Sequence, residues 1–370
     1  MRSNIVAYEL PIDGTIQVVY QTGDDHIHEM VAGQHRKWRD DDITRVAGGP
    51  RLETAIITAY PWPDGRTKQI DYTSPMSDGH IHELTLWQGR SWTYEDIMKH
   101  LAEIPPSDGI SIVGYPFKAT GSKYVVYTAA DAHIHELSVG VTSPWHYTNL
   151  TQAAGTQLVE SRVLAGYAWE AQKTRQVAYL NADGHVHELQ IDVKGSWKHQ
   201  DLTQLFEAPL AQESALSGYV WQTGETKQVV YIGDDGDIYE LAAGADNQWN
   251  YTDLTAVTSA PLAAGSTLAG FAWETGLSKQ VVYVGGDHHV HELALERNSV
   301  WKHTDLTQRT HAPEASNDVL AGHEWTAQFA KLVVYLDTDE NPHIHSLMLE
   351  HGGSWKHTDL TDVTGAEPLV

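Results

Sequence analysis

The chain has 370 residues, with 24 Lys and Arg against 49 Asp and Glu, so its formal charge is −25. Such an excess of carboxylates repels nucleic acid and anionic membranes, and we expect neither nucleic-acid binding nor membrane insertion. The sequence has no Cys, which excludes disulfides, thiolate zinc sites and cysteine nucleophiles. Its 22 His make the net charge sensitive to mild acid.

The N-terminal residues, MRSNIVAYEL, lack the apolar segment of a secretion signal, and no stretch is apolar for long enough to span a membrane. We therefore expect a soluble protein that is cytoplasmic or released without a cleaved signal peptide. The sequence leaves the compartment and the oligomeric state open.

One template of about 52 residues recurs seven times along the chain. It reads L-A-G-Y-x-W, then K-Q-V-V-Y, then D-G-H-I-H-E-L and finally W-K-H-T-D-L-T. Each segment is rich in Val, Ile, Tyr and Trp and is bounded by Gly, Asp, Asn or Ser, which is typical of strands joined by tight turns. The pattern predicts an all-β fold, a seven-bladed β-propeller with four antiparallel strands per blade. We expect a single domain over residues 1–370, with blades at 4–50, 51–107, 108–160, 161–212, 213–264, 265–316 and 317–365.

The first segment is predicted to be the innermost strand, because its third position holds a small residue in every repeat. These residues are Ala7, Ala59, Gly114, Gly166, Gly218, Gly270 and Gly322. Each repeat is complete, so we expect each blade to come from one continuous stretch of chain. Residues 97–109 depart most from the template and are expected to form a short helix before Pro105.

The third segment carries an H-x-H pair in most repeats, and in a strand both imidazoles face the same side. One interpretation is a divalent metal site; its candidate ligands are His26, His28, His185, His187, His289, His291 and His303. The fifth repeat has Asp237 and Tyr239 at these positions, which favours hydrogen bonds to the T-D-L-T residues instead. We therefore assign no metal site and expect no cofactor, with a divalent metal as the alternative.

The D-G-x-I-x-E-L segment, followed by a turn and a W-Y or W-H pair, resembles the repeat of the fungal fucose-specific lectins of the Aleuria type. Those proteins are six-bladed propellers whose sugar pockets lie between adjacent blades and contain a Glu, an Arg and aromatic rings. The resemblance implies ligand-binding roles for the Glu of the third segment and the Trp that begins the fourth. These residues are Glu29, Trp38, Glu83, Trp92, Glu136, Trp145, Glu188, Trp197, Glu240, Trp249, Glu292, Trp301 and Trp355.

Two features of this chain differ from that family besides the number of repeats. At the position that we assign to the pocket Arg, the sequence has Gln17, Gln69, Tyr124, Gln176, Gln228, Gln280 and Leu332. The seventh repeat has Ser346 in place of the Glu. The chain therefore departs from the family in having seven repeats and no pocket Arg, and we expect its seventh pocket to be the weakest.

The recurring Glu and Trp predict a multivalent carbohydrate-binding protein with glycans or glycoconjugates as partners. A carboxylate accepts two hydroxyl hydrogens, and an aromatic face packs on a sugar ring. Because a catalytic group is normally unique whereas this Glu recurs, we assign no catalytic residue. A lectin should expose the Glu and Trp in equivalent pockets.

Two other classes of function stay open on the sequence alone. One is an enzyme with its site at the mouth of the central channel, where His323 replaces the Tyr or Phe of the other repeats. The other is a metal-binding or protein-interaction scaffold, which for protein partners predicts a large apolar patch.

Overall fold

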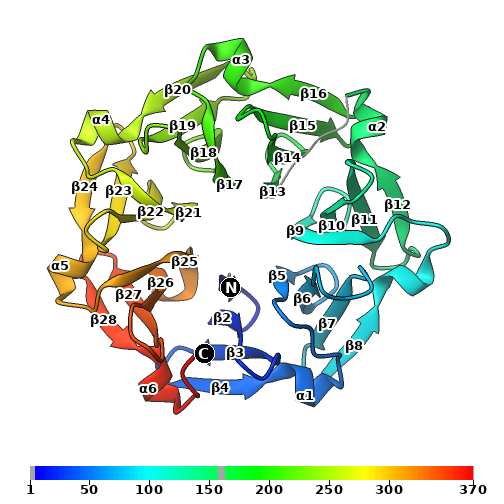
Figure 1. Cartoon of the computed structure of the whole chain (residues 1–370), viewed down its shortest axis with the longest axis horizontal. Helices are drawn as coiled ribbons and strands as arrows, with labels where there is room; N and C mark the ends of the chain where they lie inside the picture. Colours follow the sequence, from blue (N-terminus) through cyan, green and yellow to red (C-terminus); the bar gives the residue numbers. More distant parts are fainter. Residues whose placement is uncertain (1–4, 157–162, 370) are drawn as a thin grey trace.

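A computed structural model of the chain describes residues 5–156 and 163–369. It contains seven four-stranded antiparallel sheets, arranged as blades around a central opening (Figure 1). The predicted seven-bladed β-propeller is therefore confirmed. Among the described residues, no helix is both long and apolar enough to cross a membrane.

The first three blades follow one another along the chain. Blade 1 contains β1 (Val6–Leu10), β2 (Thr15–Gln21), β3 (Ile27–Ala32) and β4 (Trp38–Asp42), followed by α1 (Ile43–Ala47). Blade 2 contains β5 (Ile56–Trp62), β6 (Thr67–Thr73), β7 (His82–Trp87) and β8 (Trp92–Asp96), followed by the 3-10 helix η1 (Ile97–His100). Blade 3 contains β9 (Ser107–Phe117), β10 (Ser122–Ala129), β11 (Ile134–Gly140) and β12 (His146–Asn149), followed by α2 (Leu150–Ala154).

The next two blades repeat the same arrangement. Blade 4 contains β13 (Val163–Trp169), β14 (Thr174–Leu180), β15 (Val186–Asp192) and β16 (Lys198–Asp201), followed by α3 (Leu202–Phe206). Blade 5 contains β17 (Ala211–Trp221), β18 (Thr226–Gly233), β19 (Ile238–Ala243) and β20 (Trp249–Asp253), followed by α4 (Leu254–Thr258).

The last two blades complete the ring. Blade 6 contains β21 (Ala263–Trp273), β22 (Ser278–Gly285), β23 (Val290–Glu296) and β24 (Lys302–Asp305), followed by α5 (Leu306–Thr310). Blade 7 contains β25 (Ala315–Trp325), the 3-10 helix η2 (Thr326–Gln328), β26 (Ala330–Asp337), β27 (Ile344–Glu350) and β28 (Lys356–Asp359), followed by α6 (Leu360–Thr364).

Within every blade the strands are hydrogen-bonded in sequence order, so each blade is a meander built from continuous chain, as expected. The first strand of each blade lies nearest the central opening and the fourth lies at the perimeter (Figure 1). The inner strands are small at their third position because an aromatic ring of the preceding blade packs there. A Cβ atom on Gly218 would lie 2.5 Å from Cε1 of Tyr167, and one on Gly322 would lie 2.3 Å from Cε1 of Phe271.

The end of the fourth segment does not continue as a strand. In six blades its last residues begin a five-residue helix instead: α1, α2, α3, α4, α5 and α6. An Asp or Asn caps each of these helices; Asp201, for example, accepts a hydrogen bond from the backbone N–H of Gln204. Blade 2 has η1 at the same place, which confirms the short helix expected before Pro105.

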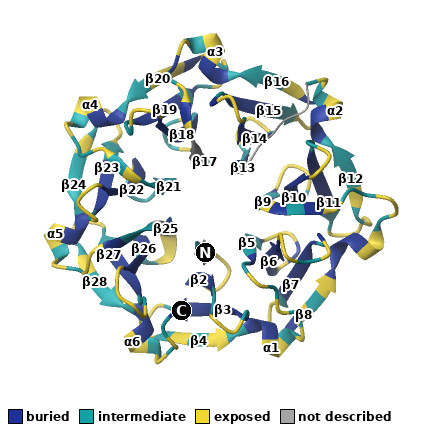
Figure 2. Cartoon of the chain, in the orientation of Figure 1, coloured by how far each residue is buried: buried dark blue, intermediate teal, exposed yellow. Residues whose placement is uncertain are grey.

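The core lies between facing sheets of neighbouring blades rather than within one blade. One buried cluster, for example, combines Ala178 and Val186 of blade 4 with Val229, Tyr231 and Leu241 of blade 5. Figure 2 shows the buried positions along the strands and the exposed positions in turns and perimeter helices. Each interface between two blades is therefore a packed contact that reaches from the central opening to the rim.

The ring closes through side chains and backbone of blades 1 and 7, without a strand exchanged between them. Glu9 accepts hydrogen bonds from the backbone N–H groups of Thr326 and Ala327, each at 2.9 Å. Trp325 donates its indole N–H to the carbonyl oxygen of Gly14 at 3.0 Å. Adjacent blades elsewhere use the same staple, since Glu324 accepts from the N–H groups of Glu274 and Thr275.

Candidate functional site

The six Glu residues of the I-x-E strands lie at the interfaces between adjacent blades, and each is at most 3% exposed. Each carboxylate is paired with a basic side chain from the second strand of the next blade. The pairs are Glu29–Lys68, Glu83–Lys123, Glu136–Arg175, Glu188–Lys227, Glu240–Lys279 and Glu292–Lys331. Six interfaces of the ring therefore contain a buried ion pair.

These basic residues are the part of the site that sequence reasoning missed. The residues assigned to the pocket Arg, from Gln17 to Leu332, each follow the basic position by one residue and face the opposite side of the strand. The K-Q-V-V-Y pattern itself contained the signal, because six buried carboxylates require six buried cations. The pocket cation is therefore present, as Arg175 in one interface and as Lys in five.

The pair between blades 4 and 5 shows the arrangement in detail. The Lys227 ammonium lies 2.8 and 2.7 Å from the two oxygens of Glu188 and 2.6 Å from Oε1 of Gln190. Tyr167 donates its hydroxyl hydrogen to Glu188 at 3.1 Å. Burial raises the pKa of the Glu188 carboxyl and lowers that of the Lys227 ammonium, and each charge opposes the shift of the other. The Glu188 carboxylate and the Lys227 ammonium therefore have hydrogen-bond partners within the protein.

The Trp residues enclose these cations. Six of the seven predicted Trp lie against the cation of an ion pair: Trp92, Trp145, Trp197, Trp249, Trp301 and Trp355. Trp residues at the ends of inner strands contribute a second ring, which was not predicted: the Lys331 ammonium lies 4.9 Å from the Trp273 ring and 5.2 Å from the Trp355 ring. Each basic side chain thus gains cation–π contacts in addition to its carboxylate.

Cavities open above two of these ion pairs and are lined by the same residue types. The cavity between blades 2 and 3 has a volume of about 400 Å³, and its lining includes Trp62, Gln69, Glu83, Lys123 and Trp145. The cavity between blades 6 and 7 has a volume of about 570 Å³, and its lining includes Trp273, Gln280, Glu292, Lys331 and Trp355. The repeat therefore places equivalent groups around separate pockets.

Several buried polar atoms at these interfaces have no hydrogen-bond partner within the part of the chain that the structure describes. One set is the amide oxygens of Gln17, Gln69, Gln176, Gln228 and Gln280. Another is the indole N–H groups of Trp62, Trp169, Trp221, Trp249 and Trp273. Buried polar groups normally have partners, so a repeated acceptor and a repeated donor beside each pocket mark places for a polar ligand or solvent.

The Glu side chains are less accessible than the lectin interpretation expected. Glu83 and Glu292 line pockets, but each is 3% exposed and already holds a basic partner. The physical reason is that a carboxylate between two sheets is stable only when it is paired. The Gln and Trp side chains, rather than the carboxylates, therefore offer the unpaired atoms.

The interface between blades 7 and 1 has no such pair. Ser346 occupies the Glu position of blade 7, and Ile16 occupies the cation position of blade 1. Both side chains are buried. Of the predicted residues, only Trp38 lies here, at a cavity that also contacts Trp325 and Ser346.

Blade 2 contains a buried acid that no other repeat has. Asp71 stands where the other six repeats have Val or Ala, is 0% exposed and lies opposite Glu83 on the neighbouring strand. Tyr60 donates its hydroxyl hydrogen to Asp71 at 2.8 Å. Burial and the charge of Glu83 raise the pKa of Asp71 well above its usual range. Because Asp71 has no exposed surface, it is not placed to contact a substrate.

The first His of each H-x-H pair is bonded to the residues that begin the perimeter helix, or the 3-10 helix in blade 2. His26 and His289 lie 2.7 Å from the N-cap carboxylates of Asp42 and Asp305, and His185 lies 3.0 Å from Oγ1 of Thr203. Hydrogen bonds to T-D-L-T residues, expected from the sequence, are therefore present.

The second His of each pair is turned toward the outer strand. His187 and His291 lie 3.1 and 2.9 Å from His199 and His303, and His28 lies 2.8 Å from Asp40. Burial lowers the pKa of His187 to about 4, whereas the Asp40 carboxylate raises the pKa of His28 against the effect of burial.

Within residues 5–156 and 163–369, three groups of His and Asp place their ligand atoms within 4.8 Å of one another: Asp24, His26 and His28; Asp287, His289 and Asp305; and His343, Asp359 and Asp362. In each group an imidazole is already held by a carboxylate. Metal binding stays the alternative that the sequence left open.

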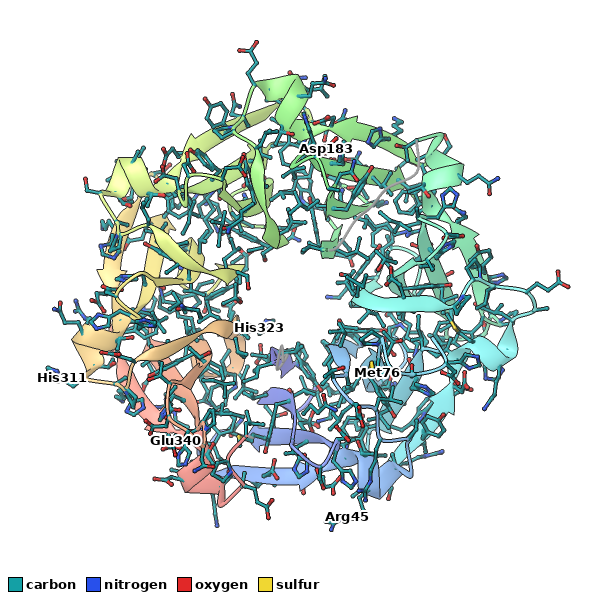
Figure 3. All side chains as sticks on the ribbon, in the orientation of Figure 1. Arg45, Met76, Asp183, His311, His323 and Glu340 are labelled. Carbon is teal, nitrogen blue, oxygen red and sulfur yellow. The ribbon has the colours of Figure 1, made fainter. Side chains whose placement is uncertain are left out.

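The candidate for an enzyme at the channel mouth is His323 on β25, which Figure 3 places beside the central opening. Burial lowers the pKa of His323 to about 4, so its imidazole is neutral at pH 7. The adjacent Glu324 carboxylate accepts hydrogen bonds from the backbone N–H groups of Glu274 and Thr275 in blade 6. Neither side chain is joined to a second catalytic group by a hydrogen bond among the described residues.

Comparisons with known proteins find similarity in structure only. No family model matches the chain, and no curated protein matches it in sequence. The BP39L lectin from Burkholderia pseudomallei matches with a TM-score of 0.75 and 14% identity, over 100% of this chain and 99% of that one. AofleA from Arthrobotrys oligospora matches with a TM-score of 0.57 and 15% identity, over 82% and 86%.

The SapL1 lectin, solved with alpha methyl fucoside, matches with a TM-score of 0.54 and 15% identity, over 81% of this chain and 94% of that one. The Aleuria aurantia lectin, a six-bladed β-propeller, matches with a TM-score of 0.50 and 11% identity, over 96% and 94%. The chain thus resembles these lectins in fold.

Proposed function

We propose that the chain is a multivalent carbohydrate-binding protein whose sugar pockets lie between adjacent blades, above the buried ion pairs. The observation that carries this proposal is a repeated pair of polar atoms, one Gln oxygen and one Trp N–H, that have no partner among the described residues and lie beside pockets lined by Trp rings. A sugar offers both hydroxyl hydrogens and hydroxyl oxygens, so it satisfies the two atoms at once. The structural likeness to lectins supports the same class of ligand.

Each residue type has a separate role in this proposal. The two Trp rings stack on the C–H faces of a pyranose, and the Gln oxygen accepts a hydroxyl hydrogen. The Glu and its cation hold the floor between the two sheets and orient both Trp rings through cation–π contacts. The carboxylates then act as positioning groups.

Repetition around the ring gives the protein several weak sites. Sites on one rigid ring bind a multivalent glycan surface with an avidity that exceeds the single-site affinity by orders of magnitude. We therefore expect weak binding of free monosaccharides and strong retention on immobilised, densely displayed glycans.

The test is binding of the untagged protein to a glycan array and to free α-methyl fucoside, with Gln69→Leu and Gln280→Leu combined in one variant. Leu332 occupies the same position in blade 7, so the fold accepts this substitution. The matched control is His311→Asn on the perimeter, where His311 is exposed and has φ 54°, a conformation that Asn adopts readily (Figure 3).

We expect saturable binding to a related group of glycans, a loss of avidity in the double variant and no change in the control. Retention of full binding by the double variant would show that glycans bind elsewhere than in these pockets. Absence of binding to every glycan by the unaltered protein would overturn the proposal.

A further inference from the structure

The pocket between blades 7 and 1, called here the closing pocket, is lined by Arg36, Lys37, Trp38, Trp325, Leu332, Ser346, Met348, Lys356, Thr358 and Val363. Its volume is about 410 Å³, similar to that of the pocket between blades 2 and 3. The loss of the ion pair has therefore not closed the space between these two blades.

Every polar group that forms the floor of the other pockets is replaced here. Leu332 stands in place of Gln, Ser346 in place of Glu and Ile16 in place of Lys or Arg. The indole N–H of Trp325 donates to the carbonyl oxygen of Gly14, whereas its counterparts Trp62 and Trp273 have no partner among the described residues. Ile16, Trp325 and Leu332 belong to one buried apolar cluster. Apart from the Ser346 hydroxyl, which donates to the carbonyl oxygen of Thr358, the floor of the closing pocket is thus apolar.

The rim of the closing pocket, unlike its floor, is charged, because it contains basic side chains. Arg36 and Lys37 precede Trp38, where the equivalent residues of blade 7 are Gly353 and Ser354. With Lys356 they give the closing pocket three basic lining residues and no acidic one, whereas the pocket between blades 2 and 3 is lined by Glu83, Glu95 and Lys123 among its charged groups.

One carboxylate lies outside this lining. Glu350 lies 2.5 Å from Arg36 and 2.9 Å from Lys356. These two cations hold the pKa of Glu350 at about 2, so it stays ionised, and the rim keeps a net positive charge in a chain of formal charge −25.

An apolar floor below a cationic rim fits a ligand that has an apolar part at one end and an anionic group at the other. We propose that the closing pocket binds a small aromatic carboxylate or sulfonate, with its ring against Trp38 and the apolar floor and its anionic group at Arg36, Lys37 and Lys356. Aromatic rings pack well on the faces or edges of Trp, and Arg and Lys bind carboxylates and sulfonates through charge-assisted hydrogen bonds. A neutral sugar finds none of the unpartnered polar atoms that the other pockets offer.

The test compares naphthalene-2-sulfonate with naphthalene-2-methanol, which has the same ring system and no charge. We expect the sulfonate to bind once per chain by isothermal titration calorimetry, at least about tenfold more tightly than the alcohol, as expected for one or two partly screened ion contacts. Binding should weaken as salt is added, and saturation with the sulfonate should raise the melting temperature of the protein.

Two variants locate the site. Lys37→Glu combined with Lys356→Glu reverses two exposed rim charges and should remove the preference for the sulfonate. Its matched control is Lys302→Glu, which changes the residue equivalent to Lys356 at the pocket between blades 6 and 7 and should leave sulfonate binding unchanged. The variant Ile16→Lys with Ser346→Glu rebuilds a buried ion pair on the floor and should abolish binding at this pocket.

Equal affinities for the sulfonate and the alcohol, or an unchanged preference in the double charge reversal, would overturn the proposal. So would a loss of sulfonate binding in the Lys302→Glu control, which would place the site at a polar pocket. Because these probes carry no sugar, the result is independent of the glycan array.

Discussion

Six interfaces of the ring contain a buried ion pair, whereas the seventh, where the ring closes, has uncharged side chains at the same two positions. The six place a carboxylate of one blade against a cation of the next, as in Glu188 and Lys227. The closing interface instead brings Ser346 and Ile16 to these positions, and side chains such as Glu9, Trp325 and Arg36 form hydrogen bonds across it. Both ion-pair partners are exchanged together, although they lie at opposite ends of the chain.

From this comparison we expect the buried pair to behave as one unit. Removal of a single partner leaves a charge without compensation between two sheets, whereas removal of both leaves an ordinary apolar contact. The closing interface is a natural version of the second case. It also shows that the propeller does not require an ion pair at every interface.

The largest expected effect comes from breaking one pair on one side only. Lys227→Ile leaves Glu188 buried without its cation and should lower the free energy of unfolding by about 3–5 kcal/mol. The double variant Lys227→Ile with Glu188→Ser copies the closing interface and should recover most of that loss. Urea unfolding at pH 7.5 measures both, with Lys198→Ala on the outer strand as the control. A double variant as unstable as the single one would contradict the view of the pair as one unit.

Acid should destabilise the blade edges through the buried His residues. Because burial lowers the pKa of His187 to about 4, its neutral form stabilises the fold above about pH 6.5, and that contribution is lost as the pH falls toward 4. The loss amounts to about 3 kcal/mol. His187→Tyr copies Tyr239 of blade 5 and should flatten the acid limb of a plot of melting temperature against pH.

The control for this titration is His35→Asn, because His35 is exposed. It should leave the shape of the pH profile unchanged. An acid limb that is equally steep with and without His187 would assign the acid sensitivity to other groups.

Crowding at the inner strands separates the five blades with Gly at the third position from blades 1 and 2, which have Ala7 and Ala59 there. Gly218→Ala places a methyl group 2.5 Å from the ring of Tyr167 and should cost about 1–3 kcal/mol of stability. Gly33→Ala is the control, since a Cβ there has only one ordinary contact, at 3.7 Å from Thr15. Blade 1 already has Ala7 at the inner position, so Ala7→Gly should cost less than about 1 kcal/mol. Equal costs at residues 7 and 218 would contradict this difference.

The smallest expected effect is a gain in stability. Asp71→Val restores the residue that most repeats have and removes a buried acid from beside Glu83. We expect a gain of about 1–2 kcal/mol at pH 7. Because the pKa of Asp71 is raised, the penalty that it imposes grows as the pH rises above about 4, and the gain should shrink in acid. A loss of stability at pH 7, measured by urea unfolding with wild type as reference, would show that Asp71 is favourable where it stands.

Much of the fold was predictable because the same local signals recur in seven repeats. Strand chemistry, turn residues and the small third residue of the inner strand are local signals, and they gave the blade count and the inner strand correctly. The perimeter helices were not predicted, because the T-D-L-T residues were taken to continue the fourth strand. The Asp before each Leu was the available signal, since it is a strong helix N-cap.

The candidate site was predictable only in part. The Glu and Trp positions recur in sequence and could be aligned, but the pairing of Glu188 with Lys227 joins two blades and leaves no local trace. An error of one residue in the basic position was enough to assign Gln228 instead of Lys227, because neighbouring residues of a strand face opposite sides. Whether a carboxylate is exposed or buried also depends on how closely two sheets approach.

The sequence by itself determined seven four-stranded blades, their order, the net negative charge and the recurrence of Glu and Trp, since all of these follow from periodicity and composition. Only the tertiary structure decided which charges meet, because a propeller brings together residues about 39 positions apart at six interfaces and residues from both ends of the chain at the seventh. The unpartnered Gln and Trp atoms, and the apolar floor below the basic rim of the closing pocket, arise from those contacts between blades.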